Sequence, residues 1–365
     1  MQIGLACFKD KQLNSMVGSY NRIGNCEILH STNVIVYDTK EDSYLVEYIE
    51  DILDAFTVAK YLKIPESDER TAYLKDFLFK WDIFSVDKDS IQKIIMEICH
   101  ERYKEEKEVF EEKVTIRELF DVDELKKNCL LKNYTWESFC YHIKHINRFH
   151  SHQMNLLQFE KLLKNMMLEI PKGTLKLYRS RICDEENYDT GYSTRKMGVP
   201  PMEKATAGRT NSEGMQCLYL SSDIMTTFHE VRARDYDHVC VGTFLQNKDI
   251  KIVDLSLFDE IGPFSNPDFD ISWFAVNIDI IRKIGSEIAK PMRRFDSALD
   301  YIPTQYICDY IKYLGYDGIK FKSTLASGGI NYAIFDEKKF ECTEVNVKCI
   351  GGVEYSVLEC AISDK

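Results

Sequence analysis

The chain has 365 residues, of which 44% are hydrophobic and 29% charged, a composition typical of a globular protein with room for two domains. Its formal net charge of −12 disfavours a general nucleic-acid binder, because such proteins usually have a basic face. No apolar stretch is long enough and poor enough in charge to be a transmembrane helix, so no membrane association is expected.

The cysteines and the N-terminus bear on the cellular compartment. The first residues lack the basic segment and the long apolar core of a secretory signal. The 12 cysteines are scattered along the chain and form no C-x-x-C motif. Without an export signal, they are expected to be mostly buried, reduced thiols in a cytoplasmic protein.

The first half of the chain has the patterns of helices. Residues 45–63 place apolar side chains three and four positions apart, which predicts an amphipathic helix. Residues 91–114 begin in the same way and end as a charged, solvated face. Residues 136–168 predict one long helix or a helix pair that ends before Pro171. We therefore expect an all-α N-terminal domain over residues 1–170, with a regulatory or assembly role.

After Pro171 the pattern changes to short β-branched or aromatic runs separated by turns and helical segments. This alternation predicts a mixed α+β domain over residues 171–365. The final segment, 342–360, suggests a two-strand ribbon that turns at Gly351 and Gly352. The predicted strands are 174–182, 216–222, 238–246, 250–256, 316–323 and 330–336, and the predicted helices are 222–234, 270–289 and 304–315.

Two groups of residues were considered as metal ligands. His142 and His145 are three positions apart, which could place two imidazoles on one helix face, but no further ligand completes the set. Cys7, Cys26 and His30 fall short of a closed tetrahedral site in the same way. We expect no bound metal at either group.

Polar residues in the second half gather at the ends of predicted elements. Arg179 and Arg209 could each clamp a pyrophosphate with two hydrogen bonds. A carboxylate such as Glu230 could accept hydrogen bonds from ribose hydroxyls and stabilise positive charge at an anomeric carbon. Each residue also has a simpler reading, since Glu230 and Arg234 could form a surface pair on a helix and Ser323 could end a strand.

Three segments taken together resemble the RES domain, a family named for an Arg, a Glu and a Ser. They are LYRSRI (177–182), AGRTNSEGMQCLYLSSDIMTTFHEVR (207–232) and YIPTQYICDYIKYLGYDGIKFKSTLASGGINYAIFD (301–336). The resemblance spans about residues 174–340 and implies an ADP-ribosyltransferase-like fold. Members of this family degrade NAD, and many are bacterial toxins. Its larger members also have an all-helical HEPN/RES-type N-terminal domain.

The resemblance implies roles for individual residues. The catalytic trio would be Arg179, Glu230 and Ser323, with Glu230 acting at the nicotinamide ribose. Shorter members have an aromatic residue at the position of Thr210. This difference bears on the orientation expected for the neighbouring Arg209. The residues expected to bind the substrate around the trio are Tyr178, Arg209, Asn211, Tyr219 and Asn331.

The expected function is therefore NAD degradation by cleavage of the nicotinamide–ribose bond, as a glycohydrolase or a phosphorylase. NAD would be the substrate, and no cofactor is expected. The resemblance implies a bacterial toxin or antiphage effector, with an antitoxin or activator protein as a candidate partner. A homo-oligomer is expected through the helical part. The alternatives are a protein ADP-ribosyltransferase, a catalytically inactive NAD or nucleotide sensor, and a helical interaction module without small-molecule chemistry.

Overall fold

The computed structural model describes residues 1–65, 67–132, 135–265, 269–291 and 297–354, and the chain divides into two compact units. The first comprises Met1–Phe139, His152–Lys161 and Leu257–Lys283, and the second comprises Cys140–Ser151, Leu162–Ser256 and Ile284–Lys365. The sequence suggested two contiguous domains that meet near residue 170. The units are instead discontinuous, because residues 257–283 group with the N-terminal part of the chain.

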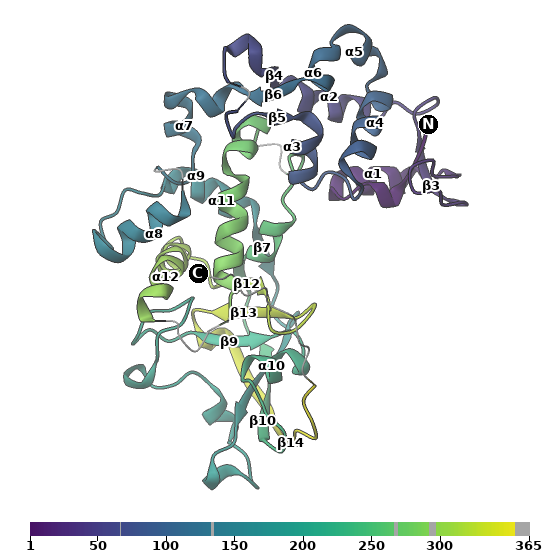
Figure 1. Cartoon of the computed structure of the whole chain (residues 1–365). Helices are drawn as coiled ribbons and strands as arrows, with labels where there is room; N and C mark the ends of the chain where they lie inside the picture. The colour runs from purple at the N-terminus through teal and green to yellow at the C-terminus, as the bar shows by residue number, and fades with distance from the viewer. Residues whose placement is uncertain (66, 133–134, 266–268, 292–296, 355–365) are drawn as a thin grey trace, which may run out of the picture. The chain divides into compact units, whose positions relative to one another are not determined.

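The first unit consists of short helices and two small antiparallel sheets (Figure 1). One sheet has the strand order β1-β3-β2 and the other β4-β6-β5. The strands are β1 (Gln2–Gly4), β2 (Ile23–Gly24), β3 (Val34–Asp38), β4 (Phe56–Val58), β5 (Ala72–Tyr73) and β6 (Lys113–Ile116). The helices are α1 (Lys11–Tyr20), α2 (Val46–Asp54), α3 (Leu74–Lys80), α4 (Lys88–Ile98), α5 (His100–Glu105), α6 (Lys107–Glu111) and α7 (Val122–Asn128).

The expectation of an all-α N-terminal domain is wrong. The helix predicted over residues 45–63 ends at Asp54, and the chain continues as β4. β4 pairs with β6, where Thr57 lies opposite Thr115. Threonine and valine favour an extended backbone because their branched β-carbons restrict the side chain in a helix. The strand pairing therefore prevails over the local helical pattern.

The segment 136–168 is a helix pair, one of the two arrangements that the sequence left open. α8 (Trp136–His145) and α9 (Leu156–Asn165) are followed by the short strand β7 (Met167–Ile170). β7 is a member of the large sheet of the second unit, where it pairs with β11. The last two residues of the predicted helical segment, Met167 and Leu168, are therefore extended.

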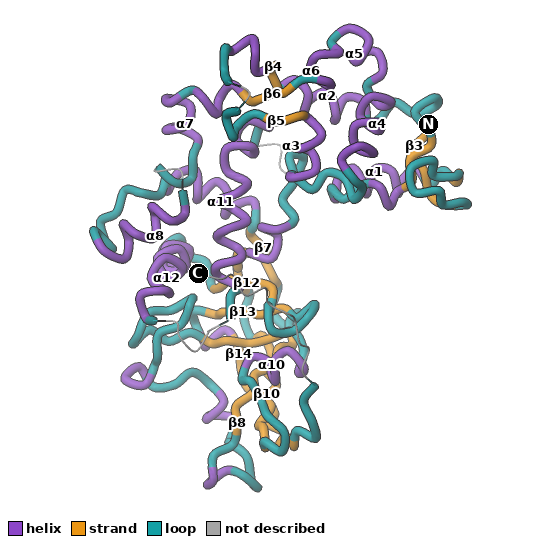
Figure 2. The backbone as a smooth tube through the Cα atoms, in the orientation of Figure 1, coloured by secondary structure: helices purple, strands orange, loops and turns teal. Residues whose placement is uncertain are grey.

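The second unit is built on an eight-stranded sheet with the order β14-β10-β8-β9-β13-β12-β11-β7 (Figure 2). Neighbouring strands are antiparallel except for β11 and β12. Each of the six predicted strands is present, which confirms the α+β class. The strands are β8 (Lys176–Ile182), β9 (Leu218–Ser221), β10 (His238–Gln246), β11 (Ile250–Asp254), β12 (Gly318–Lys322), β13 (Ile330–Ile334) and β14 (Phe340–Cys349), and the helices are α10 (Ile224–Glu230) and α12 (Ala298–Tyr313). A further helix, α11 (Ile271–Ala289), belongs to the first unit up to Lys283 and to the second unit from Ile284.

The C-terminal ribbon predicted over residues 342–360 is only partly described. Its first half belongs to β14, which pairs with β10 from Phe340 to Cys349. Residues 355–360 of its second half lie outside the described residues. The described part of this segment therefore extends the large sheet through a partner almost a hundred residues earlier in the chain.

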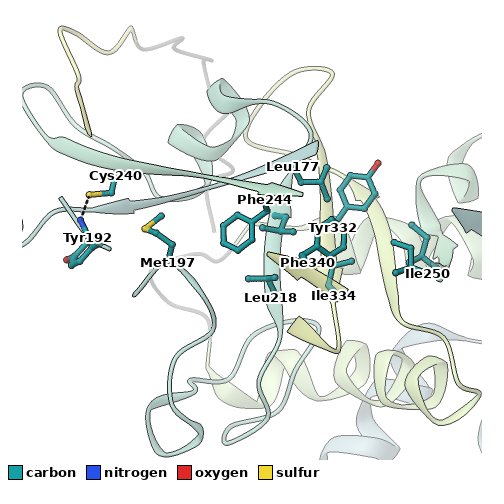
Figure 3. Packing of buried hydrophobic residues seen from close by; sticks show 12 residues of the cluster. Leu177, Tyr192, Met197, Leu218, Cys240, Phe244, Ile250, Tyr332, Ile334 and Phe340 are labelled. Atoms are coloured by element: carbon teal, nitrogen blue, oxygen red, sulfur yellow. Dashed lines mark hydrogen bonds between the residues drawn. The ribbon is translucent and has the colours of Figure 1, made fainter. Parts of the chain in front are cut away.

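A cluster of buried apolar side chains holds the large sheet together (Figure 3). Leu177 of β8, Leu218 of β9, Phe244 of β10 and Ile334 of β13 belong to it, and each is at most 2% exposed. Burying a side chain of this size contributes about 1.5–3 kcal/mol to folding. The same strands also position the polar residues described below, so the cluster fixes the framework of the site.

Gly318 at the start of β12 allows a close approach to β13. A Cβ at this position would lie 2.5 Å from the carbonyl oxygen of Ala333 on β13, and a backbone atom cannot move away cheaply. We expect Gly318→Ala to lower the free energy of unfolding by about 1–3 kcal/mol, measured by urea denaturation. The control is Gly18→Ala in α1, where the nearest atom would be 4.0 Å away and alanine favours the helix. Equal stability of Gly318→Ala and the wild type would contradict the tight strand contact.

Among the described residues, no helix combines the length and the apolar character that crossing a lipid bilayer requires.

Candidate functional site

The second unit contains a cavity of about 350 Å³, a size in the range of small-molecule pockets. Its wall is formed by β8, β9, α10, the ends of α11 and β12, and the loop of residues 206–211. These elements come from distant parts of the chain and meet because β8, β9 and β13 are neighbours in the sheet. The cavity is therefore a product of the sheet order.

The carboxylate of Glu230 is fixed at the cavity wall by two hydrogen bonds to the same oxygen. Its Oε1 accepts from the Ser323 hydroxyl at 2.7 Å and from the Asn331 side-chain amide at 2.6 Å. The Ser323 oxygen in turn accepts from the backbone N–H groups of Leu325 and Ala326. The other carboxylate oxygen, Oε2, accepts no hydrogen bond from the described residues and remains available to a ligand.

Glu230 stands in the last turn of α10, a short helix that follows β9 directly. The Asp223 side chain caps the helix, since it accepts hydrogen bonds from both the backbone N–H and the hydroxyl of Thr226. One turn later, the hydroxyls of Thr227 and Ser180 lie 2.6 Å apart and tie the helix to β8. These contacts fix the helix that presents Glu230.

Arg179 supplies a partly buried positive charge on β8. Its Nη1 donates to the carbonyl oxygens of Met197 at 3.2 Å and Gly198 at 2.7 Å. Burial, together with repulsion from Arg181, lowers the pKa of Arg179 to about 10, so the guanidinium is still charged at neutral pH. Within the described part of the chain Arg179 forms no ion pair, and its Nε and Nη2 donate to no protein acceptor. A partly buried cation with free donors favours an anionic ligand.

Tyr219 offers an aromatic surface to the cavity. Its hydroxyl accepts a hydrogen bond from Thr210 at 2.5 Å and donates one to the side-chain oxygen of Asn211 at 2.7 Å. The hydroxyl lies deep in the protein, and burial raises the pKa of Tyr219, while 37% of the residue remains exposed. Tyr178 lines the cavity as well. Such rings can stack on a flat heterocycle.

The loop of residues 206–211 is held in place from several sides. The Asn211 amide donates to the carbonyls of Thr206 at 3.0 Å and Met215 at 2.9 Å, so it shapes the loop. Gln305 of α12 donates to the carbonyls of Gly208 at 2.8 Å and Asn211 at 3.0 Å. A Cβ at Gly208 would lie 2.8 Å from the Tyr219 hydroxyl oxygen, so a larger residue here would displace that hydroxyl.

The buried Arg209 side chain lies in the same wall. Its Nη2 donates to the carbonyl of Pro291 at 3.3 Å, and its guanidinium carbon lies 5.1 Å from the centre of the Tyr301 ring. Lys290 also lines the cavity and pairs with Glu287. Among the described residues of the lining, the charged side chains are therefore three cations and one carboxylate, Glu230. The charge of the lining suits a ligand with phosphate groups.

The structure brings together nearly all the residues that the sequence singled out. Ser323 is not in the cavity lining, but it holds Glu230 through its hydroxyl. The sequence reasoning missed Ser180, Ser221, Gln305 and Lys290, because nothing in their local pattern indicates a site. The expected residues that line the cavity are Tyr178, Arg179, Arg209, Asn211, Tyr219, Glu230 and Asn331.

The first unit contains the cysteine pair considered as metal ligands. The Sγ atoms of Cys7 and Cys26 lie 3.6 Å apart, and both residues are buried. Burial and the Cys26 thiol raise the pKa of Cys7 to about 12, so this thiol stays protonated. His30 is exposed and has a left-handed backbone with φ of 52°. No group of three or more His, Cys, Asp or Glu residues in the described part of the chain is arranged to hold a metal ion.

The fold and the cavity define an α+β domain with a candidate small-molecule site whose charged lining residues are mostly cations. Residues 176–356 match the model of the RES domain, so this part of the chain belongs to the RES domain family. The match confirms the resemblance for the second half of the sequence. A comparison with curated proteins gave no match.

Two solved structures are similar to the chain at low levels. In the crystal structure of the M. tuberculosis MbcT–MbcA toxin–antitoxin complex, the similar chain is 12% identical, with a TM-score of 0.30; the match covers 52% of this chain and 92% of that chain. In the crystal structure of an anti-CRISPR protein, the similar chain is 10% identical, with a TM-score of 0.21. The match covers 50% of this chain and 100% of that chain. Both TM-scores are too low to establish a shared fold.

Proposed function

We propose that this protein degrades NAD by cleaving the bond between nicotinamide and ribose. The observation that supports this most is the presence, in one cavity, of the oriented carboxylate of Glu230 and the partly buried guanidinium of Arg179, which has no ion pair among the described residues. The carboxylate can accept hydrogen bonds from the reacting ribose, and the guanidinium can bind the pyrophosphate. Membership of the second half in the RES domain family favours the same chemistry.

In this proposal Arg179 binds the pyrophosphate of NAD. Its Nε and Nη2 point to no described protein acceptor, so they can donate two hydrogen bonds to phosphate oxygens. Arg209 and Lys290 add positive charge to the same lining. The ring of Tyr219 stacks on a flat part of the substrate. Together these contacts place the ribose beside Glu230.

Glu230 acts at the nicotinamide ribose. Its Oε2 accepts hydrogen bonds from ribose hydroxyls, while Ser323 and Asn331 hold Oε1. When the bond between C1′ and the nicotinamide nitrogen breaks, its electron pair leaves with the now neutral nicotinamide. The negative charge of Glu230 stabilises the cation that develops at C1′. An oxygen of water or of inorganic phosphate then forms the new bond to C1′, and when water is the acceptor its proton is released to solvent.

The acceptor can be identified by product analysis. The protein is incubated with NAD, with and without inorganic phosphate, and the products are separated by chromatography and weighed by mass spectrometry. ADP-ribose would identify a glycohydrolase, and phosphorylated ADP-ribose a phosphorylase. Labelling of an added macromolecule would indicate an ADP-ribosyltransferase. Tight binding of NAD without any product would contradict the enzymatic proposal and favour a sensor.

Removal of NAD would harm a growing cell, so we further propose that the protein is a toxin or antiphage effector. Such an activity needs restraint, for which an antitoxin or an activator protein is the proposed partner. Coexpression of the wild type and of Glu230→Gln in bacteria tests this part. Growth arrest and NAD loss with the wild type only are expected, and equal growth with both would contradict it.

A further inference from the structure

Ser221 forms a hydrogen bond with the Asn331 side chain, whose amide holds Glu230. Its hydroxyl donates to the side-chain oxygen of Asn331 at 2.7 Å, and the amide nitrogen of Asn331 donates to Glu230 at 2.6 Å. Ser221 on β9 and Asn331 on β13 are directly opposite in the antiparallel register. Their exposed fractions are 4% and 6%, so bulk water has little access to the amide oxygen.

The chemistry of the three groups fixes the direction of this chain of hydrogen bonds. An ionised carboxylate only accepts, so the NH₂ end of the Asn331 amide must face Glu230. The oxygen end then faces Ser221, whose hydroxyl can donate. Without that hydroxyl, no described residue donates to the buried oxygen, and a buried acceptor left unpaired is costly. The amide would then turn or shift toward another donor and weaken its hold on Glu230.

We infer that Ser221 is a positioning residue that orients Asn331 and, through it, the carboxylate of Glu230. This inference depends on the proposed function for its effect on rate, but the hydrogen-bond chain itself can be tested without turnover. Ser221 acts on the carboxylate and has no role in binding the phosphates, which Arg179 holds at the neighbouring strand. Its loss should therefore lower kcat for nicotinamide release and change KM little.

Threonine and valine at position 221 make a matched pair. Both are β-branched and of nearly equal size, and both suit a strand, but only threonine has a hydroxyl. We expect Ser221→Val to lower kcat by about ten- to a hundredfold, which corresponds to loss of a hydrogen bond in a chain that ends on a charge. Ser221→Thr should recover most of the activity. Equal kcat in the two variants would overturn the inference.

Nuclear magnetic resonance of protein labelled with ¹⁵N-asparagine reads the orientation directly. An amide proton donated to a carboxylate at short range resonates downfield of ordinary side-chain amides, and its signal is assigned by its absence in Asn331→Ala. This signal should persist in Ser221→Thr and move upfield in Ser221→Val. If valine prevents folding, Ser221→Ala replaces it in both measurements.

The two measurements separate this inference from the proposed function. If the wild type releases no nicotinamide, the proposed function fails, while the amide signal still decides the role of Ser221. If nicotinamide is released and the signal is the same in the threonine and valine variants, the positioning role fails and the enzymatic proposal stands.

Discussion

Glu230→Gln is expected to lower kcat for nicotinamide release by about a hundred- to a thousandfold, the effect of removing one preorganised electrostatic group from an enzyme site. Glutamine keeps an oxygen that can accept from Ser323 and Asn331, so the contacts of Oε1 can persist. The substitution therefore removes the charge and leaves the framework. Initial rates at saturating NAD measure the effect.

The control for this prediction is Glu213→Gln. Glu213 is an exposed carboxylate in the same unit and does not line the cavity. Its substitution changes the net charge by the same amount and should leave kcat unchanged. Equal loss of activity in both variants would show that the charge at Glu230 has no special role.

Arg179→Met is expected to raise KM for NAD by about ten- to a hundredfold. Methionine has a similar length but cannot donate to phosphate oxygens, and charge-assisted hydrogen bonds of this kind contribute about 1.5–3 kcal/mol. Arg179→Lys should recover only part of the affinity, because an ammonium cannot form the two parallel hydrogen bonds of a guanidinium. Steady-state kinetics and calorimetric NAD binding test the prediction.

The stability of Arg179→Met should stay close to that of the wild type. Burial lowers the pKa of Arg179 to about 10, which means that the folded state disfavours the charge. Below pH 10 the side chain is charged in both the folded and the unfolded state, so the full cost of the charge to the folded state is present. It is relieved only as the pH rises through about 10. Methionine removes the cost but also removes the hydrogen bonds to Met197 and Gly198. The two effects oppose each other.

Arg181→Met is the matched control for Arg179. Arg181 is on the same strand, stacks over the Tyr192 ring at 4.4 Å and does not line the cavity. The KM of Arg181→Met for NAD should remain near the wild-type value. An equal rise in KM for both variants would indicate a general disturbance of β8 instead of a lost phosphate contact.

Apart from β7, the strands of the second unit were predictable because each is a short β-branched or aromatic run between turns. The segment 238–246 was predicted with the bounds that β10 has in the structure. The strands of the first unit were not. Phe56 fits the spacing of an amphipathic helix equally well, and only its pairing with Ile116, about sixty residues away, makes it extended. Local periodicity contains no information about such a partner.

The same limit applies to the site. Arg179 and Glu230 were named through resemblance to a family, and the structure places them in one cavity, but their roles remain predictions. Ser221 and Gln305 were missed because their importance depends on contacts to Asn331 and to the loop at Gly208. A serine at a strand end and a glutamine in a helix are common in any sequence. Only the contacts of the folded chain distinguish Ser221 and Gln305 from other serines and glutamines.

The most direct test of the account is the release of nicotinamide from NAD by the purified wild-type protein and by Glu230→Gln, followed over time by chromatography. The account predicts steady release by the wild type and a loss of at least a hundredfold in the variant, with similar melting temperatures. Intact NAD after prolonged incubation with the folded wild type, or equal release by both proteins, would contradict it.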